Sequence, residues 1–388
     1  MRPVKPTPPL TPDAIAETAA TIVAVQEPDG AIPWYPGGHT DPWDHLECAM
    51  ALRIAGRPDT IEAVDAAWEW IRHTQRDDGS WATSYVAGQI KDDFADSNQC
   101  AYVATAAWHS WLATGDRSFL RRMWPVVRAA LDFVVGLQAA GGQIWWARSA
   151  DGTAYPEALL TGCSSTLHSL RCGLGLAAAL GEAVPRWEAA AGALHHALRD
   201  HPERFVDKRR WSMDWYYPVI GGALRGPRGR DRLRSRWDDF VVDGLGARCV
   251  ADQPWVTGAE TCELAIALHL VGESGAAAGL LEDIQFLRHN DGSYWTGWQF
   301  AEKLYWPPEQ STWTAAAVLL AVDSLTGGVT EAAFRGDGLP ARRSASGPGA
   351  VGAAAIPLGC SCGRGSAGRP PENLRSGSAF EDPQRSRA

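Results

Sequence analysis

The sequence lacks the features that identify several classes of protein. No stretch reaches the ~20 consecutive apolar residues that a helix needs to cross a bilayer. The proline-rich start, MRPVKPTPPL, has no apolar run of the kind found in signal peptides. Positive charge is not in excess either, because 36 Lys and Arg residues face 45 Asp and Glu residues. We therefore expect a cytoplasmic protein without stable membrane insertion and without affinity for nucleic acid.

The spacings that mark metal and cofactor sites are also missing. The eight cysteines are scattered, and Cys360 and Cys362 stand in a Gly/Ser segment without a second pair, which is a poor zinc signal. The sequence contains no HExxH, GxSxG or P-loop motif. We expect reduced cysteines, no metal and no cofactor.

Tryptophan is abundant, and its distribution divides the chain. All 19 tryptophans lie between Trp34 and Trp313, whereas Gly, Pro, Ser, Ala and Arg dominate after Gly327. Such a composition cannot bury enough apolar surface to offset the entropy of ordering the chain. We predict a flexible N-terminus at 1–11, a folded domain at 12–327, and a disordered tail at 328–388 that is dispensable for stability.

The folded part has the periodicity of helices. Apolar residues recur at i, i+3, i+4 and i+7, and no alternation of β-branched residues is long enough for a sheet. The predicted helices are 12–26, 43–56, 59–75, 97–114, 117–138, 161–180, 185–199, 213–224, 228–242, 258–271, 274–288 and 309–325. Amphipathic helices alternate with helices that are apolar nearly all round, and the latter must be buried on every side. The fold class predicted is therefore all-α, an (α/α)6 toroid of six outer/inner helical hairpins.

A short repeat follows several of the predicted outer helices. In each copy the helix ends in Gln, and a Gly and a Trp follow in the turn. The copies are VQEPDGAIPW, TQRDDGSW, LQAAGGQIWW and IQFLRHNDGSYW. We interpret them structurally: Gly ends the helix, Trp covers the helix end, and Gln bonds carbonyls of the neighbouring hairpin.

Two resemblances agree with this fold. Residues 112–194, with LATGDRSFLRRMWPVVRAALDF, and residues 306–321, WPPEQSTWTAAAVLLA, resemble the six-hairpin glycosidases of the glucoamylase type. The Gln/Trp repeat resembles that of squalene cyclases and protein prenyltransferases, which share the α/α toroid. The first resemblance implies carbohydrate metabolism, and the second implies a transferase or cyclase acting on isoprenoids.

Acidic residues occur in every loop that leads to a predicted inner helix, and these loops converge on one mouth in a six-hairpin ring. Capping of helix N-termini explains any one of these acids. It does not explain the aromatic residues beside them, which suit a sugar because its C–H faces stack on rings while its hydroxyls bond to acids. The expected substrate-binding residues are Asp44, Asp96, Trp43, Trp146, Trp215, Tyr216, Trp255, Trp295, Trp298 and Trp306.

Glycoside hydrolysis with inversion needs a protonated and an ionised carboxyl about 6.5–9.5 Å apart. The similarity of EQSTW to the last hairpin of glucoamylases implies that Glu309 is the general base. For the general acid we expect Asp214 or Glu260, because their tryptophan neighbours raise the pKa of a carboxyl by desolvation. The resulting hypothesis is a hydrolase whose small-molecule substrate is a glycan or a glycolipid.

Two other functions remain open at this point. DDFAD, with Asp92, Asp93 and Asp96, spells the DDxxD that holds a magnesium diphosphate in isoprenoid synthases, although a run of capping and surface acids has the same spelling. An enzyme of the prenyltransferase or terpene-cyclase kind would take a prenyl diphosphate in the same aromatic cavity. The other alternative is a noncatalytic toroid that binds glycans or a partner protein.

Overall fold

The inner helices begin where a capping side chain meets an apolar run. In the computed structural model, which describes residues 10–336 and residue 339, Asp41 accepts hydrogen bonds from the backbone N–H groups of Trp43 and Asp44 and starts helix α2. Asp96 caps α4 in the same way, through the N–H groups of Asn98 and Gln99. Two of the acids in the loops are therefore caps as well as candidates for chemistry.

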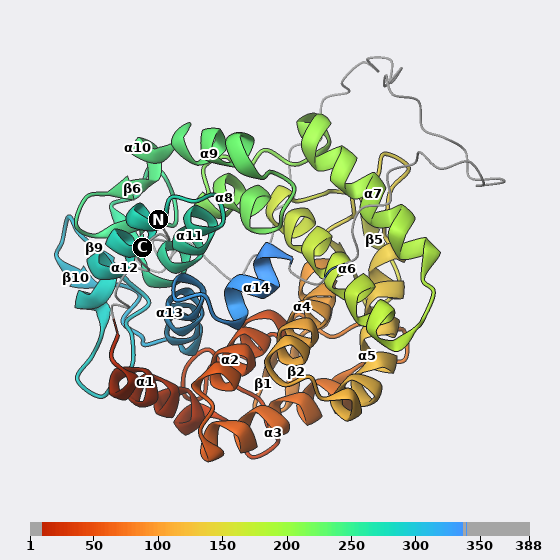
Figure 1. Cartoon of the computed structure of the whole chain (residues 1–388), viewed down its shortest axis with the longest axis horizontal. Helices are drawn as coiled ribbons and strands as arrows, with labels where there is room; N and C mark the ends of the chain where they lie inside the picture. The colour runs from red at the N-terminus through yellow and green to blue at the C-terminus, as the bar shows by residue number, and fades with distance from the viewer. Residues whose placement is uncertain (1–9, 337–338, 340–388) are drawn as a thin grey trace, which may run out of the picture. The chain divides into compact units, whose positions relative to one another are not determined.

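Six helices form a closed inner ring, with α2 beside α4, then α6, α8, α11, α13 and α2 again (Figure 1). They are α2 (Pro42–Ala55), α4 (Ser97–Thr114), α6 (Leu160–Leu180), α8 (Ser212–Ile220), α11 (Gly258–Leu270) and α13 (Thr312–Leu325). The outer helices are α1 (Pro12–Val25), α3 (Pro58–Thr74), α5 (Arg117–Gly136), α7 (Pro185–Asp200), α9 (Gly226–Arg234) with α10 (Trp237–Phe240), and α12 (Ser274–Asp283). The predicted (α/α)6 toroid is confirmed.

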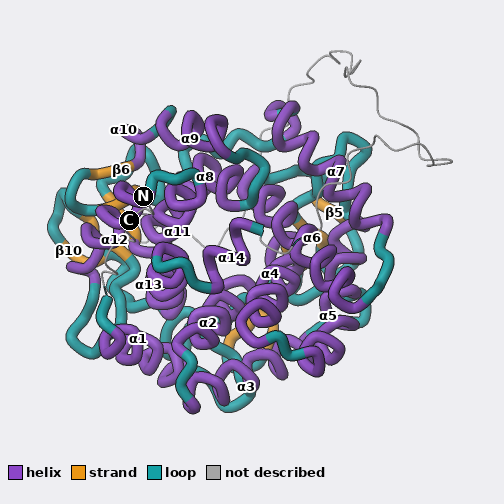
Figure 2. Tube along the Cα trace, viewed as in Figure 1, coloured by secondary structure: helices purple, strands orange, loops and turns teal. Residues whose placement is uncertain are grey.

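Short strands occupy the loops that lead into the inner helices, as Figure 2 shows. They are β1 (Ser84–Val86), β2 (Gln89–Asp92), β3 (Ala95–Asp96), β4 (Ala147–Arg148), β5 (Ala154–Tyr155), β6 (Val241–Val242), β7 (Gly246–Arg248), β8 (Trp255–Thr257), β9 (Gly297–Gln299) and β10 (Leu304–Tyr305). All the pairs are antiparallel, and the largest sheet has the order β10-β9-β8-β7-β6. Strands this short have no alternation to detect, and they brace the loops around the mouth.

The Gln/Gly/Trp repeat joins neighbouring hairpins as predicted. The side-chain amides of Gln26, Gln75 and Gln138 each donate to the carbonyl of the repeat glycine and to a carbonyl on the next outer helix, at 2.8–3.0 Å. A Cβ on Gly79, which has φ +89°, would lie 2.3 Å from the Ala129 carbonyl oxygen, so only glycine fits. The fourth copy departs from the pattern, because the Gln285 amide donates within its own helix, to Leu281.

Two predicted helices differ from those observed in ways that affect the loops around the mouth. The predicted helix 228–242 is broken into α9 and α10 and ends in strand β6, because Val241 pairs with Ala247. The predicted helix 309–325 begins later, at Thr312, because Ser311 is the N-cap and accepts from the Thr314 N–H. Glu309 consequently lies in the loop before α13 and not on the helix.

A further helix, α14 (Val329–Arg335), lies in the middle of the ring between α4, α11 and α13 (Figure 1). The composition had assigned these residues to the tail, but Thr330, Ala333 and Phe334 are buried. The tail boundary at 327 is therefore too early by this helix, and residues 340–388 lie outside the described part. At the other end Leu10 is buried and Thr11 caps α1, so order begins before residue 12.

Helix α14 fills the end of the ring away from the mouth, which we call the closed end. Phe334 stacks on His168, with ring centroids 4.8 Å apart, and Thr330 lies 3.2 Å from His109 Nε2. A cavity of about 10 Å³ remains between Phe334 and the acids near the mouth, which is room for about one water molecule. Helix α14 therefore leaves almost no free space between itself and these acids.

Within residues 10–336, no single helix has the length and apolarity to cross a membrane; α13 and α14 meet that test together, as a pair bent by 83°, on length and composition alone.

Candidate active site

The N-terminal ends of the inner helices carry four carboxyl groups in a regular arrangement. Asp44 and Glu47 are three residues apart on α2, and Glu260 and Glu263 are three residues apart on α11. Residues at i and i+3 lie on the same helix face. Each helix therefore presents an upper acid in its first turn, Asp44 or Glu260, and a lower acid one turn further from the mouth, Glu47 or Glu263.

Burial and neighbouring acids favour the protonated form of the upper acid of α2. The carboxyl of Asp44 hydrogen-bonds that of Asp41, and burial together with the nearby carboxylates Asp41, Glu47 and Glu263 raises its pKa well above its usual range. Like charges at a shared site resist ionisation of both groups. Asp44 is half-buried and can therefore meet both a ligand and its partner acid.

The upper acid of α11 stands at the same level of the ring. Glu260 is 2% exposed, and its carboxylate hydrogen-bonds the Cys249 thiol. Glu47 of α2 and Glu263 of α11 line the same small cavity, so the acid faces of these two helices are turned toward one another. Glu260 lies one turn nearer the helix start than Glu263, as Asp44 does relative to Glu47.

The lower acids are enclosed by aromatic donors. The carboxylate of Glu47 accepts from Trp43 Nε1 at 2.9 Å, the Tyr102 hydroxyl at 2.7 Å and Trp313 Nε1 at 2.7 Å. The carboxylate of Glu263 accepts from the hydroxyls of Tyr216 and Tyr217. Burial is the main cause that raises the pKa of both carboxyls, while these donors lower it.

Glu309 stands at the seam where the first and last hairpins meet. Its carboxylate accepts from Trp34 Nε1 at 2.6 Å, and the Trp34 ring packs against Trp313 at 5.4 Å and stacks on His39 at 5.7 Å. The side chain is half-buried in the loop before α13. The structure thus brings Glu309 to the mouth, on the same seam as Glu47.

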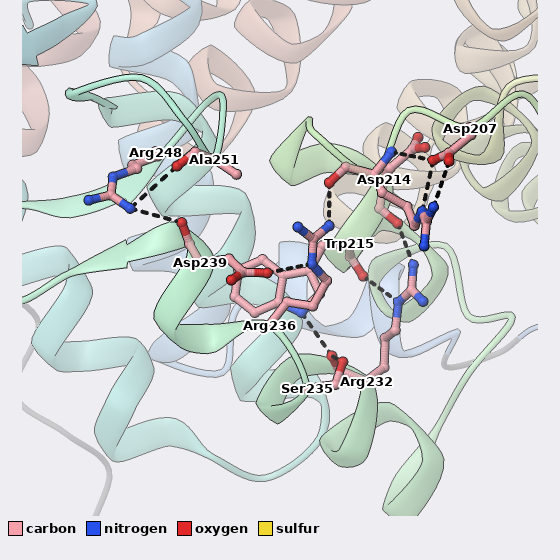
Figure 3. Close-up of polar contacts among 10 residues, drawn as sticks. Asp207, Asp214, Trp215, Arg232, Ser235, Arg236, Asp239, Arg248 and Ala251 are labelled. Carbon is pink, nitrogen blue, oxygen red and sulfur yellow. Dashed lines mark hydrogen bonds and ion pairs between the residues drawn. The ribbon is translucent and has the colours of Figure 1, made fainter.

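Asp214 serves as a bridge between inner helices. Its Oδ1 accepts from the Thr161 hydroxyl at 2.7 Å and the Thr161 N–H at 3.3 Å, and its backbone carbonyl accepts from Arg232 of α9 (Figure 3). Burial raises the pKa of its carboxyl, against the lowering effect of Thr161, Lys208 and Arg232. The acid predicted from the sequence is thus fixed between α6 and α8 by hydrogen bonds.

The arginine-rich segment before α10 contributes to this packing. Arg232 donates to the carbonyls of both Asp214 and Trp215, and Arg236 pairs with Asp239 (Figure 3). Trp215 itself is 0% exposed, donates to the Arg232 carbonyl and stacks on Phe240. Its indole lies under α9 and α10, so the expected sugar contact from Trp215 is replaced by a place in the core.

Most of the other aromatic residues predicted to contact sugar lie at the mouth, either in its loops or in the first turn of an inner helix. Trp43 packs on Tyr102 and meets Tyr217 edge-on, and Trp146 packs on Phe94 and Tyr155. Four half-buried tryptophans lie on or beside the largest sheet. The Trp255 indole donates to the Trp306 carbonyl at 2.6 Å, and the rings of Trp295 and Trp298 both pack on Tyr305. Tyr216 is fully buried against Glu263 and reaches the site only through that acid.

The DDFAD acids do not form one cluster. Asp92 accepts from the Ser84 hydroxyl, Asp93 pairs with Arg76, and Asp96 caps α4. Burial raises the pKa of Asp96 to about 6. Within the described ranges, 10–336 and 339, no group of three or more His, Cys, Asp and Glu residues is placed to hold a metal ion.

Sequence reasoning missed Glu47, Glu263 and Tyr102. The acidic pair spacing DxxE in DPWDHLE and ExxE in GAETCE was the available signal, because each spacing marks two acids on one face of a helix that is otherwise apolar. Tyr102 carried no such signal, since it looks like any core aromatic of α4.

Comparisons with known proteins show a relative that shares most of the chain. The chain is 54% identical over 332 residues to "MMP endo-(1,4)-3-O-methyl-alpha-D-mannosidase" of Mycolicibacterium hassiacum, an alignment that covers 85% of this chain and 91% of that protein. No family model matches the chain.

Solved structures share the fold at low identity. A glycosidase variant in complex with glucose has a TM-score of 0.63 at 14% identity, covering 81% of this chain and 96% of that one. A D-mannose isomerase reaches 0.63 at 11% identity, over 82% and 99%. A cellobiose 2-epimerase from Spirochaeta thermophila reaches 0.59 at 13% identity, over 81% and 97%. These relatives give no support to the prenyltransferase and squalene-cyclase interpretations.

Proposed function

The chain belongs to the family of the MMP endo-(1,4)-3-O-methyl-α-D-mannosidase and is a glycosidase-type enzyme that acts on glycans; from this premise we propose that it hydrolyses internal α-(1→4) bonds between 3-O-methyl-D-mannose units. A methyl group on O3 replaces a hydroxyl donor by apolar surface. The half-buried tryptophans around the mouth supply matching surface, and the carboxylates supply acceptors for the remaining hydroxyls.

The observation that carries the proposal is the pair of acids in the first turns of α2 and α11, whose lower neighbours Glu47 and Glu263 line one cavity. Burial and the Asp41 carboxyl raise the pKa of Asp44 well above its usual range, which is the direction that a general acid requires. Asp44 donates its proton to the glycosidic oxygen as the bond from that oxygen to C1 breaks. Glu260 takes a proton from the attacking water, whose oxygen bonds to C1 from the opposite side, so that one water is consumed and the anomeric configuration inverts.

This assignment changes two roles expected from the sequence. Glu260 becomes the base, because it shares a helix face with Glu263, which lines the same cavity as Glu47 of α2. Glu309 becomes a rim residue that binds sugar hydroxyls, because its carboxylate is held at the seam by Trp34. Asp214 remains a bridge, since Thr161 already satisfies the oxygen nearest α6.

The test is hydrolysis of an α-(1→4)-linked 3-O-methyl-D-mannose oligosaccharide, followed by mass spectrometry and by proton NMR within the first turnover period. We expect shorter oligosaccharides, not single sugars released from one end, and a β-anomer that appears first and then mutarotates. An α-anomer formed first would contradict the inverting pair, and absence of cleavage would contradict the substrate.

A further inference from the structure

The lower acid Glu47 joins two indoles that come from opposite ends of the chain. Trp43 belongs to the first inner helix and Trp313 to the last, and these helices meet where the ring closes. One carboxylate oxygen, Oε1, accepts from the Trp43 indole, and the other, Oε2, accepts from the Trp313 indole. The carboxylate is 4% exposed, so water does not compete for these bonds.

The two indoles differ in exposure, because Trp43 is half-buried at the mouth whereas Trp313 is 4% exposed and belongs to the core. Trp43 is half-buried and packs at 5.4 Å against Tyr102, which donates to the same Glu47 oxygen. Trp313 packs at 5.4 Å against Trp34, whose indole N–H holds Glu309. The orientation of aromatic side chains on both sides of the seam therefore depends on one carboxylate.

The chemistry explains why the residue is glutamate. A carboxylate accepts through both oxygens, whereas an amide of the same shape accepts through one oxygen and presents N–H groups on its other end. In a glutamine variant one indole N–H would face another donor, and a buried donor left without an acceptor is destabilising. The wall would relieve this by turning one indole.

Resting on the proposed function, we propose that Glu47 is a positioning residue for substrate binding, which fixes the half-buried indole of Trp43 in the aromatic wall of the sugar site and anchors it to the buried indole of Trp313 across the closure of the ring. It does not touch the reacting atoms. Its removal should therefore weaken binding of the 3-O-methylated sugar more than it slows the bond-breaking step.

The test compares Glu47→Gln with the unaltered full chain on the α-(1→4)-linked 3-O-methyl-D-mannose oligosaccharide. We expect KM to rise about tenfold, the equivalent of about 1.4 kcal/mol, while kcat falls by less than about threefold. In NMR spectra of protein with ¹⁵N-labelled tryptophan, the indole N–H signals of Trp43 and Trp313 should move upfield. Asp323→Asn is the matched control, because Asp323 is a half-buried carboxylate at the closed end that accepts from the Thr330 N–H, and it should leave KM unchanged.

A second set of variants covers the case in which Glu47→Gln does not fold. Trp43→Phe and Trp313→Phe keep an aromatic ring but remove the N–H that Glu47 holds, and their combination should raise KM by a similar factor. In that doubly substituted background Glu47→Gln should add less than about twofold, because residues that act through one contact are not additive.

The proposal is overturned if Glu47→Gln or the two Trp→Phe changes leave KM unchanged, or if kcat falls as much as KM rises. Failure of the proposed function has a different signature, namely absence of cleavage by the unaltered protein. In that case the indole signals still decide whether Glu47 holds both rings, and unshifted signals in Glu47→Gln would overturn the positioning role.

Discussion

Burial shifts the pKa of carboxyl groups at the mouth and of histidines at the closed end in opposite directions. At the mouth, burial raises the pKa of carboxyl groups, well above the usual range for Asp44 and to about 6 for Asp96. At the closed end, burial lowers the pKa of His109 and His168 to about 3. In each case burial favours the neutral form, because a low-dielectric environment disfavours charge.

The neutral groups have different partners at the two ends. The closed end uses neutral imidazoles as packing surfaces for α14, with His168 stacked on Phe334. At the mouth, burial and neighbouring acids favour the protonated form of Asp44, which is half open to ligands. The comparison teaches that a shifted pKa alone does not mark an active site, whereas a shifted pKa on an accessible group beside a second acid does.

The largest expected effect is at the mouth. Glu260→Gln should lower kcat by at least about 10²-fold, because an amide cannot accept a proton from water. Glu309→Gln should mainly raise KM, because an amide still offers an oxygen to Trp34 and to a sugar. Steady-state kinetics on the same oligosaccharide decide between them. A larger loss of kcat in Glu309→Gln would return the role of base to Glu309.

At the closed end the largest effect is on stability. Phe334→Ala should lower the free energy of unfolding by about 3–5 kcal/mol, as for other buried aromatics, because Phe334 is 6% exposed and packs on His168. Urea denaturation measures it, with Val206→Ala as a control at an exposed position. KM should stay constant. An unchanged unfolding midpoint would show that α14 is dispensable, as the composition of the tail had suggested.

A smaller expected effect is that groups at the two ends of the ring give protein stability a different pH dependence. His109 and His168 have folded-state pKa values below the ordinary 6.5, so their contribution to stability is complete above pH 6.5 and is lost as the pH falls toward 3. Asp96 has a raised folded-state pKa, so its contribution is complete below pH 3.8 and is lost as the pH rises toward 6.

Substitutions at the two ends should therefore bend the pH profile in opposite directions. Asp96→Asn should make stability rise more steeply between pH 4 and 6, and His168→Gln should make it rise less steeply. Melting temperatures in a series of buffers measure both slopes. Parallel profiles for the two variants would contradict the opposite roles of burial.

How far the sequence predicts this molecule depends on whether local patterns determine each feature. Hairpin order and the Gln26, Gln75 and Gln138 contacts follow from periodicity and from a repeat, so they were predictable. Helix α14 was not, because seven residues between glycines give no periodic signal and its burial depends on a ring formed by distant residues.

The site was predicted in part for the same reason. The loops that carry the acids were identified, but their roles depend on contacts across the ring. Trp215 and Tyr216 are adjacent in the sequence, yet one is packed under α9 and the other bonds Glu263. The pairing of Asp44 with Asp41 is local to the start of α2, whereas that of Glu47 with Trp313, 266 residues away, appears only when the ring closes.

The most direct test of the account is the response of Asp44→Asn to the leaving group. We compare the oligosaccharide with an aryl glycoside of the same 3-O-methyl-α-D-mannose chain, whose phenolate departs without protonation. If Asp44 is the general acid, the variant should lose at least about 10²-fold in kcat on the oligosaccharide, lose the alkaline limb of the pH profile, and keep most of its activity on the aryl glycoside. An equal loss on both substrates, with the alkaline limb intact, would contradict the claim that the protonated acid at the mouth is the catalyst.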